Sequence, residues 1–129
     1  MSDVDDAREW VKYAEEDMIL AKSALRRIKP LTMGSCFHSQ QCAENNLKAI
    51  LVSKDFEFPK TLDLLILDGL CKEAGVLTGF TKDDLGRLSG YAVRTRYPGN
   101  QPVPKEAKEA LEIAIQVRHF ARAFLGLKK

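Results

Sequence analysis

Apolar residues recur along most of the chain at alternating steps of four and three positions, the spacing that gives a helix one apolar face. The first series is formed by Ala7, Val11, Ala14, Met18, Ala21, Leu25 and Ile28. Ser2 and Asp5 have the spacing of a capping box before it, and Pro30 cannot continue a helix. The pattern predicts a long first helix, widened by Trp10 and Tyr13, that packs near-antiparallel against a second long helix.

A second helix is predicted over 33–53. Its apolar face is formed by Cys36, Phe37, Ala43, Leu47, Ile50 and Leu51. Gln40 falls on the same face, which is a conflict because an unpaired polar group inside a core costs about 1–3 kcal/mol. Residues 54–60, closed by Pro59, form the predicted connection to the next helix.

A third helix is predicted over 62–74, with Thr61 as its cap. The run 64–67 is apolar on nearly every side, so we expect neighbouring helices or a second subunit to cover it. Gly75 and Gly79 mark the break that follows this helix.

Two further helices complete the predicted fold. Thr81 and Asp84 form a capping box before a short fourth helix, which ends in the loop 95–102. Pro104 suits the first turn of a fifth helix, where its missing N–H costs little. That helix has an alanine-rich apolar face, formed by Ala107, Ala110, Ala114, Val117, Ala121 and Phe124. With no strand-like alternation and no internal repeat, the sequence predicts an all-α, up-and-down bundle of four to five helices in a single domain, 1–129.

The composition agrees with one folded domain. The chain has 129 residues, of which 45% are hydrophobic and 29% charged, and its formal net charge is +2. These values exclude intrinsic disorder. No apolar run approaches the ~18 residues of a membrane span, and the acidic start lacks the basic-then-apolar order of a signal peptide. We therefore expect a cytoplasmic protein that does not associate with membranes.

Charge and cysteine placement add two expectations. Acidic residues gather in 1–20 and basic ones in 113–129. This distribution is favourable for helix dipoles, and a binding stripe is the alternative interpretation.

The three cysteines, Cys36, Cys42 and Cys71, contain no CxxC pair, so we expect buried reduced thiols and neither a metal nor a cofactor.

Polar residues of the second predicted helix form the first candidate site. His38, Gln41 and Asn45 lie three and seven positions apart, on one helical face. In one interpretation they make polar contacts between helices. In the other they line a polar cleft for a small anionic or heterocyclic ligand.

The second candidate site lies at the end of the fourth helix. Arg94 and Arg96 can satisfy the last carbonyls of that helix, or they can bind a phosphate bidentately. Tyr97 offers a face on which a base can stack, and Pro98 with Gly99 fixes the turn. The residues alone leave both interpretations open.

Standard catalytic signatures are absent from the sequence: it contains no Walker loop, GxGxxG, HExxH or GxSxG. His38 and His119 are the only imidazoles, and we expect His119 to face solvent.

Several pieces, in order along nearly the whole chain, resemble the HEPN domain family. They are Trp10, Ala14, Asp17 and Ala21, the runs 36–44, 47–49 and 59–64, and the block 91–99. The resemblance implies an up-and-down bundle, usually a homodimer, associated with nucleotides or RNA. Prokaryotic members are often encoded beside a minimal nucleotidyltransferase, in a toxin–antitoxin-like pair. Carried over by position, the ligand-binding candidates are His38, Gln41, Arg94, Arg96 and Tyr97, near one shared cleft.

Two departures from the family pattern matter. Many relatives have histidine where this chain has Leu62, so one polar contributor to the cleft is missing. Catalytic HEPN ribonucleases carry an arginine followed after four to six residues by a histidine. Neither 31–33, before His38, nor 112–114, before His119, contains an arginine. We therefore expect no catalytic residue and no ribonuclease activity of that type.

Three hypotheses about function remain at this point. The first is a dimeric module that binds a nucleotide, an RNA end or a partner nucleotidyltransferase. The second is a divergent, metal-independent ribonuclease that uses His38 with Arg94 or Arg96. The third is a structural interaction protein that dimerises through the apolar third helix and the alanine-rich fifth.

Overall fold

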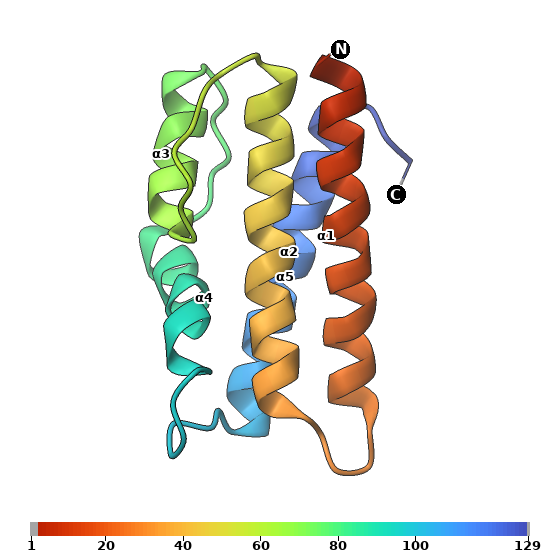
Figure 1. The fold of residues 1–129 in the computed structure, drawn as a ribbon, viewed down its shortest axis with the longest axis vertical. Coiled ribbons are helices and arrows are strands. Elements are labelled where there is room, and N and C mark those ends of the chain that lie inside the picture. Colours follow the sequence, from red (N-terminus) through yellow and green to blue (C-terminus); the bar gives the residue numbers. More distant parts are fainter. Residues whose placement is uncertain (1–2, 129) are drawn as a thin grey trace.

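The computed structural model describes the backbone of residues 3–128 and the side chains from Ala7 to Lys128. Residues 3–128 form five helices: α1 (Asp3–Arg26), α2 (Thr32–Ser53), α3 (Leu64–Glu73), α4 (Lys82–Arg94) and α5 (Pro104–Phe124). In Figure 1, α1, α2 and α5 run the length of the molecule, while α3 and α4 follow one another along the other side of α2. No strand forms within the described backbone, so the prediction of an all-α bundle is confirmed.

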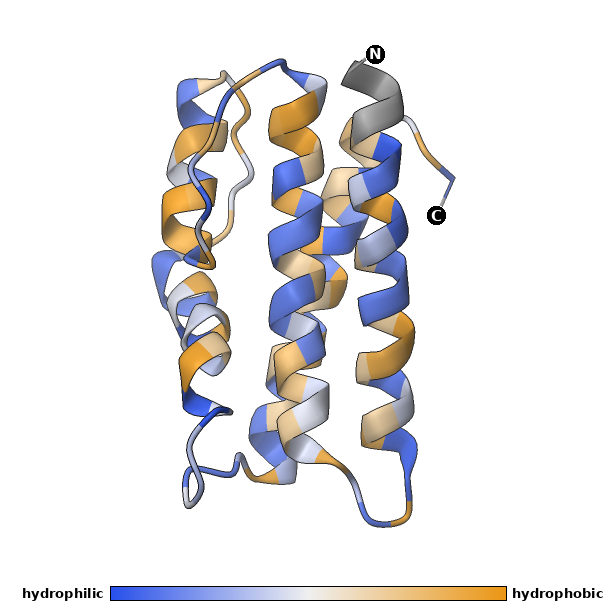
Figure 2. Ribbon diagram, viewed as in Figure 1, coloured by the Kyte–Doolittle hydropathy of each residue, from blue (hydrophilic) through white to orange (hydrophobic). Residues whose placement is uncertain are grey.

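The central helix of the bundle is α2. It contacts each of the other four helices, and fourteen of its 22 residues are buried. The larger apolar cluster of the core includes Leu47, Ile50 and Leu51 of this helix. Figure 2 shows hydrophilic as well as hydrophobic residues along α2. Since this helix is covered on nearly all sides, some of its polar residues are buried too.

Gln40 shows how this burial is tolerated. Its side chain is fully buried, and Nε2 donates a hydrogen bond of 2.9 Å to the carbonyl oxygen of Leu62 and one of 3.3 Å to Glu44. Pairing resolves the conflict seen in the sequence for Nε2, since a buried donor with partners avoids most of the desolvation cost, whereas the buried Oε1 of Gln40 has no hydrogen-bond partner among the described residues. The hydrogen bond from Gln40 to the Leu62 carbonyl also holds the segment before α3 against α2.

Several predicted helix ends need correction. α3 begins at Leu64 and not at Leu62, because Asp63 and not Thr61 is its N-cap: the Asp63 carboxylate accepts from the Leu65 amide at 2.9 Å. Thr61 instead accepts from the amide of Asp63 at 3.0 Å. The cap of α4 is confirmed, because the Thr81 hydroxyl accepts from the Asp84 amide. The predicted capping box of Ser2 with Asp5 lies outside the described side chains.

The first predicted helix also ends earlier than its apolar series predicted. α1 ends at Arg26, and Ile28 in the following turn is fully exposed instead of extending the apolar face. Tyr13 is exposed too, so it does not widen that face. Trp10 is half-buried and packs edge-on against Phe58, with ring centroids 5.9 Å apart.

The apolar third helix is only partly covered. Leu64 and Leu67 are buried, whereas Leu65 and Ile66 are exposed on the outer face of α3. The alanine-rich face of α5 is used within the chain: its alanines pack in the core, against α2 and α1. The prediction of a dimer contact through this α5 face is therefore wrong, because that face is already occupied.

The acidic and basic ends of the chain meet in the folded protein. Arg118 binds the Glu15 carboxylate through Nε and Nη2, each at 2.7 Å, and Arg122 adds a bond of 3.1 Å. The Arg118 hydrogen bond lowers the pKa of Glu15. These ion pairs thus join α5 to α1. Neither the helix-dipole nor the binding-stripe interpretation of the charge pattern predicted such a contact.

The three cysteines are free and buried, as predicted. Burial raises the pKa of each thiol to about 12, so the neutral thiol is the form present at neutral pH. Within the described residues, none of the helices is long and apolar enough to cross a membrane.

Candidate functional site

The polar face of α2 is organised around one carboxylate of α1. Asp17 Oδ1 lies 2.9 Å from His38 Nδ1, and Asp17 Oδ2 accepts a bond of 3.0 Å from the Asn45 amide. Burial raises the pKa of Asp17, and the contacts with His38 and Asn45 offset part of that rise. Gln41 lies between them in sequence and is half-buried. The structure thus makes His38 and Asn45 part of the contact between α1 and α2.

His38 nevertheless keeps one edge toward solvent. Its side chain is 29% exposed and borders an open groove of about 300 Å³ between the end of α1 and the start of α2. The groove is lined mainly by Leu20, Ala24, Leu31 and Gly34. Among the described residues, Nε2 of His38 has no protein hydrogen-bond partner. A carboxylate on Nδ1 with an open Nε2 is the arrangement in which an imidazole can accept a proton from a ligand.

A second polar group of α2 lies deeper in the molecule and is occupied internally. The Lys48 ammonium binds the Glu44 carboxylate at 2.8 Å, and both side chains are buried. The same ammonium lies 5.4 Å from the centre of the Trp10 ring and 5.9 Å from that of Phe58. This cluster joins α1, α2 and the loop after α2, and its two buried charges are paired with each other.

Arg94, the first member of the arginine–tyrosine block, is held within the protein. Its Nη1 and Nη2 donate to the two carboxylate oxygens of Glu106 at 2.7 and 3.2 Å, and its Nε donates to the Asn100 carbonyl at 3.0 Å. The hydrogen bond from Arg94 is the main reason why the pKa of Glu106 is lowered. Glu106 also accepts from the Val103 amide, which caps α5. Arg94 therefore braces both ends of the loop between α4 and α5.

The next two members of the block face solvent. Arg96 is exposed, and the Tyr97 side chain is 58% exposed. Their backbone amides donate to the carbonyls of Val93 and Arg94, so both residues continue the last turn of α4. Gly99 follows with a φ of 90°, a conformation that residues with a side chain rarely adopt. The loop thus presents a cation and an aromatic ring next to each other from a braced backbone.

The structure does not bring the two candidate sites together in one chain. His38 turns toward Asp17 of α1, whereas Arg94 reaches across to Glu106 of α5. In Figure 1, α2 lies between α1 and α4. A single cleft formed by all five predicted residues is therefore absent from the one chain described here.

The partners of these residues were not identified from the sequence. Asp17 lies 21 positions before His38, and Glu106 lies 12 positions after Arg94. The position of Glu106 in the first turn of α5 was the available signal, because an acid there can cap a helix and bind a nearby arginine. Within the described part of the chain, no group of three or more His, Cys, Asp or Glu residues is placed to hold a metal ion.

Comparison with known proteins assigns this arrangement to a family. The family model described as HEPN domain matches residues 7–124. Among solved structures, the crystal structure of TT1696 from Thermus thermophilus is similar, with a TM-score of 0.71 and 25% sequence identity; the match covers 91% of this chain and 96% of that one. None of the curated proteins that were compared matches. Since the family match spans most of the chain, this protein belongs to the HEPN domain family.

Proposed function

We propose that this protein is a dimeric binding module that recognises a nucleotide or the end of an RNA through Arg96 and Tyr97. Membership of the HEPN family supports a nucleotide- or RNA-related role in general. The observation that carries the proposal is the braced loop after α4, on which these two side chains are exposed.

The chemistry of the loop suits a nucleotide. A guanidinium donates two parallel hydrogen bonds to a phosphate, and an exposed tyrosine ring stacks on a base of any sequence. Arg94 binds Glu106 and Asn100, so its role is to position the loop. A loop held in one conformation loses less entropy when it binds a ligand. The adjacent pair therefore has both the chemistry and the rigidity that phosphate recognition requires.

We also propose that a second copy docks beside this loop. An open groove of about 550 Å³ runs between the segment 60–65 and α4, and its apolar walls include Leu65 and Val93. Gly86 and Gly90 form part of its floor, and no described atom from outside α4 lies within 4 Å of a Cβ built at Gly90. A helix of a second copy can approach such a floor closely. Because α4 continues into the loop, a partner there would lie next to Arg96.

The binding proposal predicts that Arg96→Ala weakens nucleotide binding by tenfold or more, because the phosphate loses its bidentate partner. Binding of ATP and of short RNAs would be measured by isothermal titration calorimetry. Lys108→Ala is the matched control, since it removes an exposed cation from the second turn of α5. Tyr97→Ala should weaken the binding of ligands that contain a base but leave the binding of inorganic phosphate unchanged. Equal losses in Arg96→Ala and Lys108→Ala would contradict a specific site.

The dimer proposal predicts that Gly90→Glu gives a monomer by analytical ultracentrifugation, with its helical circular dichroism unchanged. A charged side chain there would have to be buried without a partner. Lys82→Glu, at the exposed start of α4, is the control. A dimer that survives Gly90→Glu would place the contact elsewhere.

A nucleotidyltransferase partner is a further part of the proposal, supported by the family resemblance. Co-expression with a nucleotidyltransferase encoded beside this protein should give a complex that survives size-exclusion chromatography. Separate elution of the two proteins at micromolar concentration would argue against it.

A divergent ribonuclease is the second candidate function, and the contact between Asp17 and His38 favours it. The carboxylate contacts Nδ1 of the ring, and His38 lines the groove at the end of α1. This candidate predicts RNA cleavage in the presence of EDTA that is lost in His38→Ala and reduced in Asp17→Asn. Cleavage that persists in His38→Ala would assign the activity to a contaminant.

A further inference from the structure

Two long stretches of the chain, 18–43 and 85–105, contain no acidic residue, and each contains several arginines and lysines. Each stretch includes a loop between helices, the first between α1 and α2 and the second between α4 and α5. Figure 1 shows these two loops at the same end of the bundle. A contact joins them, because Gln101 Nε2 donates a hydrogen bond of 3.4 Å to the Thr32 hydroxyl oxygen. The fold therefore brings the two acid-free stretches together.

This surface, which we call the basic end, exposes the cations Arg26, Arg27, Lys29, Arg96 and Lys105. Within the described part of the chain, none of these five side chains forms a hydrogen bond or an ion pair. The acid that follows in sequence, Glu106, is already paired with Arg94. Cations that gather without carboxylates repel one another and create a positive potential, which an anionic ligand relieves.

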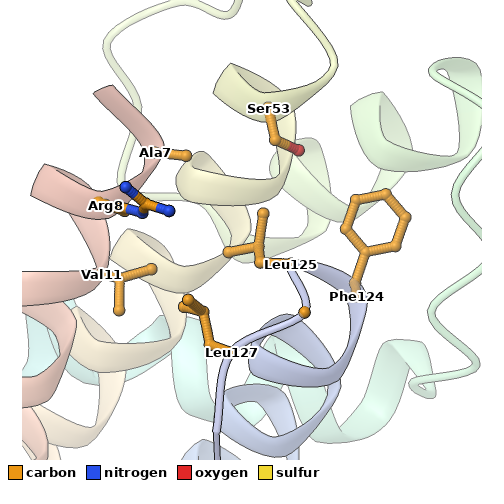
Figure 3. A pocket seen from close by; sticks show the side chains of 8 residues that line it. Ala7, Arg8, Val11, Ser53, Phe124, Leu125 and Leu127 are labelled. Carbon is orange, nitrogen blue, oxygen red and sulfur yellow. The ribbon is translucent and has the colours of Figure 1, made fainter. Parts of the chain in front are cut away.

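The opposite end of the bundle does not carry such a charge. Its loop after α2 exposes residues of both signs, namely Lys54, Asp55 and Glu57. This end also contains a pocket of about 250 Å³ with a mainly apolar lining (Figure 3). Positive charge is therefore concentrated at the basic end, although the formal net charge of the whole chain is only +2.

Both loops of the basic end are held in place by hydrogen bonds. The Leu31 amide donates to the Ala24 carbonyl at 2.9 Å, which closes the turn after α1. Arg94 braces the loop after α4 through Glu106 and the Asn100 carbonyl. The cations therefore project from backbones that are already ordered, so binding of a ligand costs less conformational entropy.

We propose that the basic end binds a single strand of RNA along its phosphate backbone, with a base stacked on Tyr97 and phosphates on both loops. The inference rests on the proposed function and extends it, because the ligand becomes a strand of several nucleotides. A strand offers one phosphate per nucleotide and can pair with cations of two loops at once. Surfaces that bind single strands combine such a basic surface with an aromatic ring for stacking, and the Tyr97 ring is 58% exposed beside Arg96.

The salt dependence of strand binding tests the proposal. The affinity for a labelled oligouridylate of about eight nucleotides would be measured by fluorescence anisotropy at several salt concentrations. Each phosphate contact with a single strand contributes about −0.7 to the slope of log affinity against log salt. The triple variant Arg26→Gln, Arg27→Gln and Lys29→Gln should weaken the strand at least tenfold at low salt and make this slope shallower by about 2. Its binding of uridine monophosphate, measured by calorimetry, should stay unchanged.

A second triple variant is the control for charge and folding. Lys12→Gln, Lys54→Gln and Lys82→Gln remove three exposed lysines outside the basic end. This variant should bind the strand as the parent protein does, and both triple variants should keep the parent's circular dichroism and melting temperature. Equal losses of strand affinity in the two triple variants would overturn the proposal, because the attraction would then depend on total charge alone.

Strand length and sugar separate this proposal from the proposed function. An oligouridylate that binds no tighter than uridine monophosphate, with both lost in Arg96→Ala, would overturn the inference and leave the proposed function standing. Conversely, a strand weakened by the Arg26, Arg27 and Lys29 variant but not by Arg96→Ala would overturn the proposed function and keep the contact with the loop after α1. Oligodeoxyuridylate should bind as oligouridylate does, since phosphates are contacted; a strict requirement for ribose would contradict binding along the backbone.

An anionic lipid surface is the alternative that the same cations allow, because Ile28 is fully exposed between Arg27 and Lys29. Phosphatidylglycerol vesicles would be tested beside the oligonucleotides. Ile28→Ser should leave the strand affinity unchanged, since the backbone of the strand contacts the cations. Vesicle binding that is lost in Ile28→Ser, together with no binding of oligouridylate, would assign the basic end to lipid and overturn the proposal.

Discussion

Single arginines in this protein differ in what they do, although they look alike in the sequence. Arg94 and Arg118 are each held by a carboxylate through two hydrogen bonds, whereas Arg96 is exposed. The difference arises because Glu106 and Glu15 lie on neighbouring helices, at positions that the folded bundle brings opposite the arginines. A guanidinium held in this way stabilises the fold, and an exposed one is available to a ligand.

The Glu15 cluster predicts a pH dependence of stability. Because Arg118 lowers the pKa of Glu15 in the folded state, the contact is fully present above the ordinary value of 4.5 and is lost as pH falls through the lower folded value. The free energy of unfolding, measured by urea titration, should fall by about 1 kcal/mol or less from this group, since the cluster is partly solvated.

Glu15→Gln is the control for this effect. It should lower stability at neutral pH and should show a smaller further loss under acid than the parent protein. An identical acid response in both proteins would assign the pH dependence to other carboxylates.

At the scale of helices, periodicity predicted all five elements, whereas side-chain hydrogen bonds decided where they begin. The four-and-three spacing identified α1 and α5 because each buries one face, and it also identified α2, although that helix is covered on nearly all sides. The predicted start of α3 was Leu62, with Thr61 as the cap, but it is the Asp63 carboxylate that caps the Leu65 amide. Capping depends on backbone angles that the apolar pattern does not contain.

The N-cap of α3 can be tested directly. Asp63→Ala should lower the free energy of unfolding by about 0.5–2 kcal/mol, because the first turn of α3 loses its acceptor. Asp63→Asn should cost little, since asparagine is an equally good cap. Chemical denaturation monitored by circular dichroism would measure both variants. An equal loss of unfolding free energy in Asp63→Asn and Asp63→Ala would contradict the capping role.

The candidate site was only partly predictable for the same physical reason. The sequence identified His38, Arg94, Arg96 and Tyr97 as residues with suitable chemistry. It did not pair His38 with Asp17 or Arg94 with Glu106, because such contacts depend on how distant helices pack. It also placed all candidates near one cleft, whereas α2 separates the two groups within the chain.

For the molecule as a whole, stability depends on α2 more than on any other element. α2 contacts all four remaining helices, and Leu47 is fully buried within the larger apolar cluster. Removing side-chain volume at such a position weakens several helix contacts at once. A bundle with one central helix is therefore expected to unfold as a unit.

Leu47→Ala should lower the free energy of unfolding by about 2–5 kcal/mol, which is a large part of the about 5–15 kcal/mol of a typical domain. Fluorescence of Trp10 and far-ultraviolet circular dichroism should report the same midpoint in urea. Leu77→Ala, at an exposed leucine between α3 and α4, is the control and should change little. Two separate midpoints would show that part of the bundle unfolds on its own.

The enclosure of α2 also bears on how this fold can diverge. Fourteen of its residues are buried, so most changes there would act first on folding. Leu65, Val93, Arg96 and Tyr97 lie on the surface of other elements and carry no such constraint. Natural selection can therefore exchange ligands or partners by altering the outer helices and the loop after α4, while the same interior is inherited unchanged.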